Sequence, residues 1–235
     1  MPVKRYIEDK DFGRITLSTR RGARRITMRI KPEGLFLTVP PYTKTEKVAE
    51  VLEQFREDLL ERYRQIATKP IDFSFRIEAE CFRLSLSPSK LKCFTVKRKD
   101  SGEMVVCCPE RTDFSSKEVQ KLVRGAILRA MKKTAAEFLP PLLAVWAERY
   151  GMTYRKVKIT GARSRWGSCT AARTISLSCY LMLVPSRLMD YVILHELAHT
   201  REMNHGPHFW ELLDRMTAGH ARQLRNELRA FRTSF

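Results

Sequence analysis

Residues 190–210, DYVILHELAHTREMNHGPHFW, hold four of the five histidines in the chain. His195 and His199 lie four residues apart in an apolar run without proline, so a helix would project both imidazoles from one face. Glu196 follows the first histidine, where a general base can stand beside a zinc-bound water whose pKa the metal lowers from about 16 to about 7. The stretch predicts a helix that carries the active site of a zinc hydrolase.

A third protein ligand is expected nearby, because a catalytic zinc usually takes three and keeps the fourth position for water. His205 lies a short way beyond the helix, and Asn204 before it tolerates the left-handed backbone that often ends a helix. We expect a turn there that brings His205 to the metal. Other interpretations stay open: His208 as a fourth pocket group or an ordinary helix-start residue, and a glutamate ligand from Glu211 or Glu227.

The composition favours a globular protein, since 235 residues with 43% hydrophobic side chains can bury a substantial core. The first residues, MPVKRYIEDKDFGR, contain no apolar run typical of a secretory signal, and no stretch reaches the roughly 18 apolar residues of a membrane span. We therefore expect a cytoplasmic location and no membrane contact. The six cysteines form no CxxC pair, which predicts reduced, mostly buried thiols.

The net charge of +18 would attract nucleic acid or acidic partners. The densest basic cluster is RRGARR at residues 20–25. A solvated hairpin turn explains it equally well, and no aromatic residues alternate with these arginines to stack on bases. Nucleic-acid binding is therefore a secondary hypothesis beside a peptide or protein substrate.

The front of the chain predicts a three-stranded antiparallel sheet followed by a helix. Residues 14–18 and 26–30 alternate apolar and polar side chains on either side of the arginine-rich turn, which favours a hairpin. A second turn at residues 32–34 precedes a third alternating strand at 35–39. From Thr45, a suitable N-cap, apolar residues recur at helical spacing until Lys69-Pro70.

The next segment repeats this arrangement at an offset of about 70 residues. Self-similarity at a fixed offset indicates a duplicated unit. GLFLTVP at residues 34–40 resembles GEMVVCCP at 102–109, and a helical pattern follows each. Strand-like runs lie at residues 73–77, 82–86, 93–96 and 104–108, and the helix is predicted at 112–129. We interpret the two segments as a duplicated sheet-and-helix unit.

The remaining chain predicts the catalytic part of an α+β protein. Pro140-Pro141 should interrupt any continuation of the preceding helix, and residues 142–149 form another. Two short strands at residues 157–159 and 174–178 flank a polar loop, and Pro185-Ser186 starts the HELAH helix. We predict three domains: N-terminal unit 1–69, second unit 70–139, and a zincin-like catalytic region 140–235 with a small sheet and the HExxH helix.

Several motifs together resemble the YgjP-like metallopeptidases, relatives of the SprT-like zincins. They are RWGSC at residues 165–169, ISL at 175–177, Pro185, DYVILHELAH at 190–199 and NHGPHFW at 204–210. The resemblance covers essentially the whole chain. It implies one Zn²⁺ per chain with His195, His199 and His205 as ligands and Glu196 as the general base. The family places an asparagine after the ISL-type strand, where this chain has Ser178-Cys179.

The expected reaction is zinc-dependent hydrolysis of a peptide bond, with Glu196 moving a proton from the water to the leaving amine. An extended substrate would add to a sheet edge, for which residues 174–178 are the candidate. A structural role for Arg165 is the favoured interpretation, in which it pairs with a carboxylate such as Asp190 while Trp166 fills the core. A structural zinc closed by His208 is a rival interpretation. The candidate donors to the developing oxyanion are Arg163, Arg165, Tyr180 and His208.

Overall fold

The computed structural model describes residues 4–31, 34–66 and 70–231. These fall into two compact units, Met1–Lys69 and Pro70–Phe235, each described here by itself. The turn predicted at residues 32–34 and the end of the helix predicted at 67–69 lie partly outside the described residues. Within the described part of the chain, no helix is long and apolar enough to cross a membrane.

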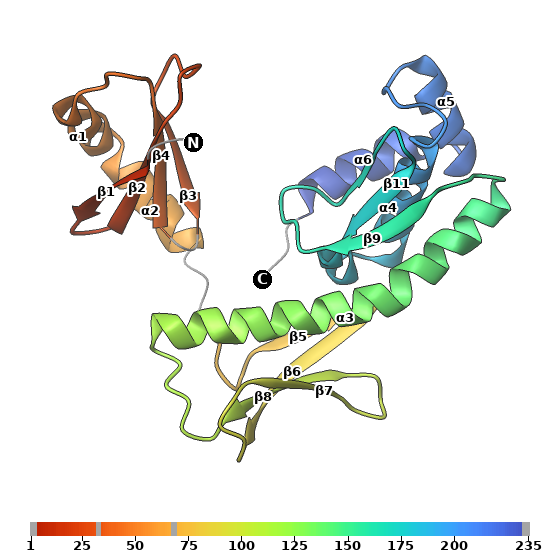
Figure 1. Ribbon diagram of the computed structural model, residues 1–235, viewed down its shortest axis with the longest axis horizontal. Coiled ribbons are helices and arrows are strands. Elements are labelled where there is room, and N and C mark those ends of the chain that lie inside the picture. The colour runs from red at the N-terminus through yellow and green to blue at the C-terminus, as the bar shows by residue number, and fades with distance from the viewer. Residues whose placement is uncertain (1–3, 32–33, 67–69, 232–235) are drawn as a thin grey trace. The chain divides into compact units, whose positions relative to one another are not determined.

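The first unit is a four-stranded sheet with two helices (Figure 1). Its strands are β1 (Lys4–Asp9), β2 (Gly13–Thr19), β3 (Thr27–Lys31) and β4 (Gly34–Val39). Their order is β1-β2-β4-β3, with β4 parallel to β2 and antiparallel to β3. The predicted hairpin of β2 with β3, and the all-antiparallel sheet, are therefore wrong. The apolar strand β4 takes a central place because alternate residues, Leu35, Leu37 and Val39, are buried in the core.

Two helices, α1 (Thr45–Gln54) and α2 (Arg56–Ile66), replace the single helix predicted here. The break lies at Phe55, whose φ of −109° and ψ of 11° end α1. Lys44, one residue before the expected N-cap, precedes the first helical residue and makes no capping hydrogen bond. The core of this unit joins the helices to the sheet through Phe12, Ile15, Leu35, Leu37, Val39, Val48, Leu52 and Leu59.

The second unit opens with another four-stranded sheet. Its strands are β5 (Arg76–Ala79), β6 (Phe82–Ser89), β7 (Thr95–Arg98) and β8 (Met104–Pro109). The order β5-β6-β8-β7, with β6 parallel to β8, repeats the order and directions of the first sheet. The parallel registers also agree, because Thr16 pairs with Phe36 and Leu86 with Val106, so both partners shift by 86 − 16 = 106 − 36 = 70 residues.

A single helix, α3 (Lys117–Arg149), follows and continues through Pro140-Pro141. The predicted start at residue 112, the interruption at the prolines and the separate helix at 142–149 are therefore wrong. Two prolines remove only two backbone donors, whereas the helix buries Leu139 and Leu143 completely on either side of them. The predicted domain boundary between residues 139 and 140 falls inside this helix.

A third, smaller sheet lies near the end of α3 in Figure 1. Its strands are β9 (Lys156–Thr160), β10 (Gly167–Cys169) and β11 (Thr174–Ser178), in the order β10-β11-β9. The sheet edge predicted at residues 174–178 is wrong, because β11 is the central strand. Its Ile175 and Leu177 are fully buried, as a central position favours. The strand beside the active-site helix is instead β10, which contacts that helix.

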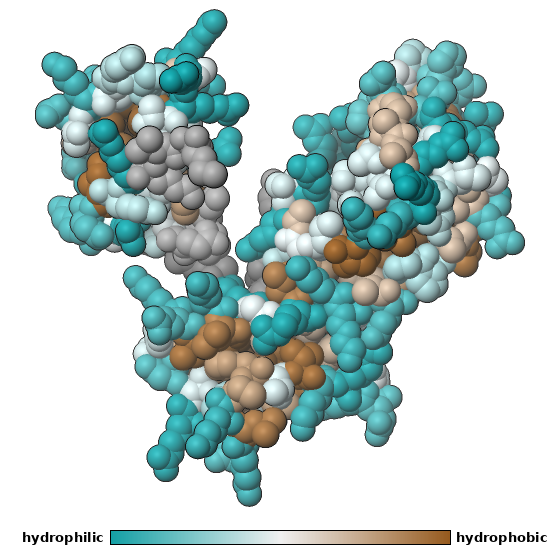
Figure 2. All heavy atoms as spheres, viewed as in Figure 1, coloured by the Kyte–Doolittle hydropathy of each residue, from teal (hydrophilic) through white to brown (hydrophobic). Residues whose placement is uncertain are grey.

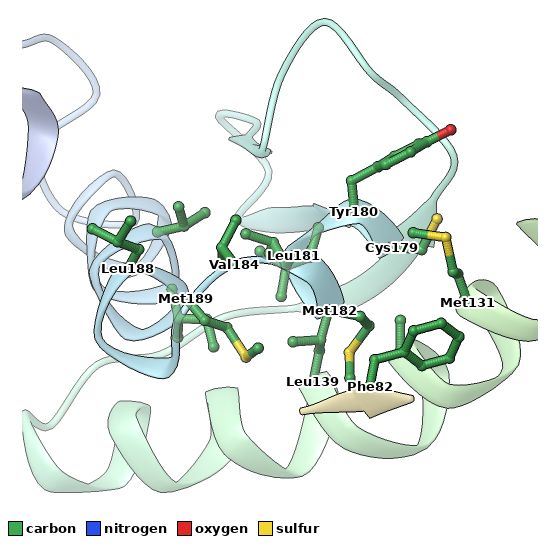
Figure 3. Close-up of a cluster of buried hydrophobic side chains, with 14 of the residues drawn as sticks. Phe82, Met131, Leu139, Cys179, Tyr180, Leu181, Met182, Val184, Leu188 and Met189 are labelled. Atoms are coloured by element: carbon green, nitrogen blue, oxygen red, sulfur yellow. The ribbon is translucent and has the colours of Figure 1, made fainter. Parts of the chain in front are cut away.

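The active-site helix is held over the rest of the unit by a short 3-10 helix, η1 (Cys179–Leu183). Figure 3 shows side chains of η1 packed between α3 and the start of α4 (Ser186–Ala198). Two more helices, α5 (Pro207–Met216) and α6 (Ala221–Ala230), pack on α4. This apolar layer fixes the helix that carries the first two histidines. The six cysteines are free, and three of them, Cys107, Cys108 and Cys179, are buried.

Candidate active site

Helix α4 delivers His195 and Glu196 in its last turn, and His199 is its C-cap residue. The backbone N–H of His199 donates to the carbonyl oxygen of His195 at 3.2 Å, so the helical turn continues up to the second histidine. The two imidazoles consequently lie on one face, with ring centroids 4.8 Å apart. The predicted HELAH helix is confirmed by this arrangement.

The loop after α4 brings His205 to the other two histidines. Its Nε2 lies 3.2 Å from Nε2 of His199 and 3.2 Å from Nε2 of His195. Three nitrogens on a tetrahedral zinc, each about 2.0–2.1 Å from the metal, are separated by about 3.3 Å. The chain turns at Asn204, whose carbonyl oxygen accepts from the N–H of Gly206 at 2.8 Å, although Asn204 does not take the left-handed backbone expected there.

The protonation of the imidazoles suits a metal ion. Nδ1 of His199 lies 3.0 Å from the carbonyl oxygen of Glu202, so Nδ1–H donates a hydrogen bond to that oxygen. Nε2 therefore keeps its lone pair available for a metal ion between the three histidines. Burial lowers the pKa of His199, and burial together with the neighbouring His199 and His205 lowers the pKa of His195 to about 3. Neutral imidazoles are the form that binds metal, and a group of three could hold one ion.

Phe209 was not predicted from the sequence, and its ring contacts the imidazoles of all three histidines. Its side chain is fully buried in the first part of α5. Its ring centroid lies 5.0, 4.5 and 4.8 Å from those of His195, His199 and His205. The motif NHGPHFW contained this residue, but an apolar side chain inside a helix gives no local sign that it touches three separate imidazoles.

Glu196 lies against the backbone of the edge strand β10. A Cβ atom placed on Gly167 would lie 2.6 Å from Oε1 of Glu196 and 2.7 Å from its Cγ. The carboxyl group is 5% exposed, its Oε2 is buried without a hydrogen-bond partner, and burial raises its pKa to about 8. Only glycine leaves room for the Glu196 carboxyl group at this position. The glycine belongs to the RWGSC motif, whose part in holding Glu196 could not be seen without the fold.

The other predicted site residues lie elsewhere. The guanidinium carbon of Arg163 lies 5.4 Å above the ring of the buried Tyr180, and both line a cavity of about 420 Å³ together with Arg165. The three histidines do not line that cavity. His208 is exposed in the first turn of α5, outside the three-histidine group.

The alternative ligands and the predicted partner of Arg165 have other positions as well. Glu227 forms an ion pair with Arg187, and Glu211 is exposed on α5. Neither belongs to the histidine group found in the described residues. Asp190 was expected to pair with Arg165. Its Oδ1 instead accepts a hydrogen bond from Nε1 of Trp146 at 2.8 Å.

The family described as "YgjP-like, metallopeptidase domain" matches residues 24–231. Among solved structures, the chain is similar to the metallopeptidase zymogen of Pyrococcus abyssi abylysin, at 21% identity and a TM-score of 0.36. That similarity covers 39% of this chain and 91% of the other. No curated protein matches the sequence.

Proposed function

Because the chain belongs to the YgjP-like metallopeptidase family, we propose that it hydrolyses peptide bonds with one Zn²⁺ held by His195, His199 and His205, and with Glu196 as general base. The observation that carries this proposal is the convergence of three Nε2 atoms on one point beside a buried, unpartnered carboxyl group. Three imidazoles without a carboxylate are a donor set of catalytic zinc, which leaves a coordination position for water.

In the proposed reaction, the zinc and Glu196 would have separate roles. Bound zinc would polarise the scissile carbonyl and make a nearby water more acidic. Burial favours the neutral form of Glu196, and a cation bound beside it would favour the carboxylate, which is the form that can accept a proton. Glu196 would accept a proton from the attacking water and return it to the leaving amine nitrogen. None of the oxyanion donors expected from the sequence, Arg163, Arg165, Tyr180 and His208, lines the cavity that His195 and Glu196 line, so the proposal assigns this role to none of them.

The substrate would lie along β10. The N–H of Ser178 donates to the carbonyl oxygen of Trp166, and that of Thr170 to the carbonyl oxygen of Thr174. Because such pairs alternate in an antiparallel ladder, the backbone groups of Gly167 and Cys169 point away from β11, toward the open side of the sheet. A substrate strand there would pass in front of Glu196. Adding peptide to Glu196→Gln protein should protect the amides of Gly167 and Cys169 from hydrogen exchange.

Metal analysis tests the ligand set. Elemental mass spectrometry on protein purified without chelator or histidine tag should find about one zinc per chain. His205→Ala should reduce that content, whereas His208→Ala, a matched change outside the cluster, should keep it. Glu196→Gln should keep the zinc and lose a factor of roughly 100 to 10,000 in peptide turnover. Full zinc in His205→Ala, or full turnover in Glu196→Gln, contradicts the proposal.

We also propose that the two four-stranded units arose by duplication. The equal strand order and the constant 70-residue shift of the parallel registers support this, since independent folds need not share a register. The antiparallel partners differ in offset: Leu37 pairs with Met28 but Cys107 with Thr95, and Ile15 pairs with Ile7 but Ser85 with Arg76, so the connections between the strands have changed in length. Related chains should keep the 70-residue offset of β4 and β8 and vary at these connections.

A specific observation in the first unit favours a second candidate function, nucleic-acid binding. A groove of about 1260 Å³ lies at the connection between β2 and β3, where Figure 2 shows hydrophilic side chains projecting. No aspartate or glutamate lines it, and its arginines form no ion pair among the described residues. Phosphate groups are the complementary ligand. The arginines that line it are Arg20, Arg21, Arg24, Arg25 and Arg29.

Salt dependence tests this second function. Affinity for a 20-nucleotide DNA, measured by fluorescence anisotropy, should fall steeply between about 50 and 200 mM salt. Replacing Arg24 and Arg25 with glutamine should weaken DNA binding. It should also lower the slope of log affinity against log salt concentration by about two. Arg62→Gln is the control in the same unit, because Arg62 is already paired with Asp58 at 3.0 Å. An unchanged DNA affinity in the double variant contradicts a role for the groove.

A further inference from the structure

A cavity of about 190 Å³ lies beside His195 and Glu196, between α4, α6 and the start of β10. It is smaller than the roughly 300–1,000 Å³ of a pocket that encloses a whole small molecule. Its size suits a single side chain instead. Because His195 and Glu196 form part of its wall, a side chain held there belongs to a residue next to the reacting peptide bond.

The cavity has apolar walls and a cationic side. Trp166, Val192 and Leu228 supply the apolar surface, while Arg225 and Arg229 line it from α6. The two arginines are four residues apart on that helix, so their guanidinium groups share one face. Glu196 is the one acid among the lining residues, and it lies at the opposite wall, against β10.

A buried hydroxyl in the same wall has no partner. Tyr191, one helical turn before His195, is 3% exposed, and its Oη is buried without a hydrogen bond. Oε2 of Glu196 is the second buried oxygen of this wall without a partner. Neither oxygen has surface that a ligand atom in the cavity can reach, so Arg225 and Arg229, which line the cavity, are its groups that suit an acidic side chain.

We propose that this cavity is the substrate side-chain subsite and that it selects glutamate next to the cleaved bond. The methylenes of glutamate would contact Trp166 and Leu228, and its carboxylate would accept a hydrogen bond from Arg225. Leucine would offer no acceptor to Arg225, and lysine would be repelled by the two arginines. The location of the cleaved bond rests on the proposed function, whereas selection of a glutamyl side chain does not.

A matched pair of substitutions isolates the cavity. The guanidinium carbons of Arg222 and Arg225 lie 5.0 and 5.1 Å from the centre of the same Trp210 ring, but only Arg225 lines the cavity. Arg222→Gln and Arg225→Gln therefore remove equivalent cation–π contacts from α6, and both lower the net charge by one. Any difference between the two variants reports on the cavity rather than on helix packing or overall charge.

Cleavage and binding are measured in parallel on zinc-loaded full-length protein. Cleavage sites in a proteome-derived peptide library should be enriched in glutamate beside the broken bond. Arg225→Gln should lower the glutamate-over-glutamine preference about tenfold, the effect of one charge-assisted hydrogen bond, and Arg222→Gln should keep it. Binding of acetyl-Ala-Glu-Ala-amide and its glutamine analogue to Glu196→Gln protein is followed by NMR titration, with and without Arg225→Gln.

The outcomes separate the subsite from the peptidase chemistry. Glutamate preference in both assays, lost in Arg225→Gln alone, supports the subsite. A cleavage profile without acidic preference, or one that Arg222→Gln changes as much as Arg225→Gln, overturns it and leaves the peptidase intact. Preferential binding of the glutamyl peptide without any cleavage keeps the subsite and contradicts the proposed reaction. Equal binding of the two peptides without cleavage contradicts both.

Discussion

Gly167 and Glu196 are in such close contact that a Cβ atom on the glycine would lie 2.6 Å from Oε1 of the glutamate. The contact joins the edge strand to the active-site helix, and it sets the position of the carboxyl group relative to the histidines. Because the glutamate is 5% exposed, it has little room to move aside. The strand that would receive the substrate thus also positions Glu196, the proposed general base.

Gly167→Ala should therefore lower kcat by about 10- to 1,000-fold, since small misplacements of a catalytic group are costly. The zinc content should stay near that of the wild type, because the atoms nearest to the new methyl group all belong to Glu196, which is not a proposed ligand. Gly206→Ala is the control near the site, since a Cβ there meets no atom within 4 Å. Full activity in Gly167→Ala would show that Glu196 can be displaced without loss.

Phe209→Leu should weaken zinc binding by about 10- to 100-fold, the range found when groups that orient metal ligands are changed. The phenyl ring fills the space under all three imidazoles, and a leucine cannot contact them equally. Chelator competition measures the affinity. Phe82→Leu, at a buried site away from the histidines, should reduce stability by a similar amount without changing the affinity for zinc.

The site was more predictable than the fold because its signal is local. His195 and His199 share a helical face by spacing, and the turn before His205 lies within a few residues of that helix. The pairing of β2 with β4 depends on contacts across an intervening strand, which no local pattern encodes. The same holds for the contact of Gly167 with Glu196, where the two residues are distant in sequence.

Helix α3 shows the limit of local rules in the other direction. Pro140-Pro141 predicts a break, yet the helix continues, because Leu139 and Leu143 are fully buried on its continuous inner face. Burial of an apolar side chain contributes about 1.5–3 kcal/mol, which offsets the roughly 3 kcal/mol cost of a proline in a helix. The helix propensities of single residues do not include a tertiary contribution of this size.

The first unit should lose stability in acid through Asp9. Nη2 of Arg56 lies 2.9 Å from Oδ2 of Asp9, and this hydrogen bond lowers the pKa of the carboxyl group from 3.8 to about 2. A depressed folded-state pKa means that the stabilisation is complete above about pH 4 and is lost as the pH falls toward 2. Its size is at most about 2.5 kcal/mol. Asp9→Asn should remove this part of the pH dependence in urea unfolding.

The control for that experiment is Asp58→Asn, because Asp58 pairs with Arg62 on the exposed side of α2, with half its side chain accessible at 53%. An exposed pair contributes about 0–1 kcal/mol, so its removal should leave the acid transition nearly unchanged. An identical acid transition in wild type and Asp9→Asn would assign the loss of stability to other carboxyl groups.

Removal of the metal should loosen the loop that carries His205. This residue is exposed and reaches the other histidines across a turn, so its imidazole is held chiefly by what it binds. Treatment with a chelator should lower the unfolding temperature and speed amide hydrogen exchange across residues 200–206. Exchange in the middle of α4 should change little, because Ile193 and Leu194 are buried in the apolar core. In His205→Ala the chelator should have a much smaller effect on the loop, and an equally large effect would mean that His205 does not bind the metal.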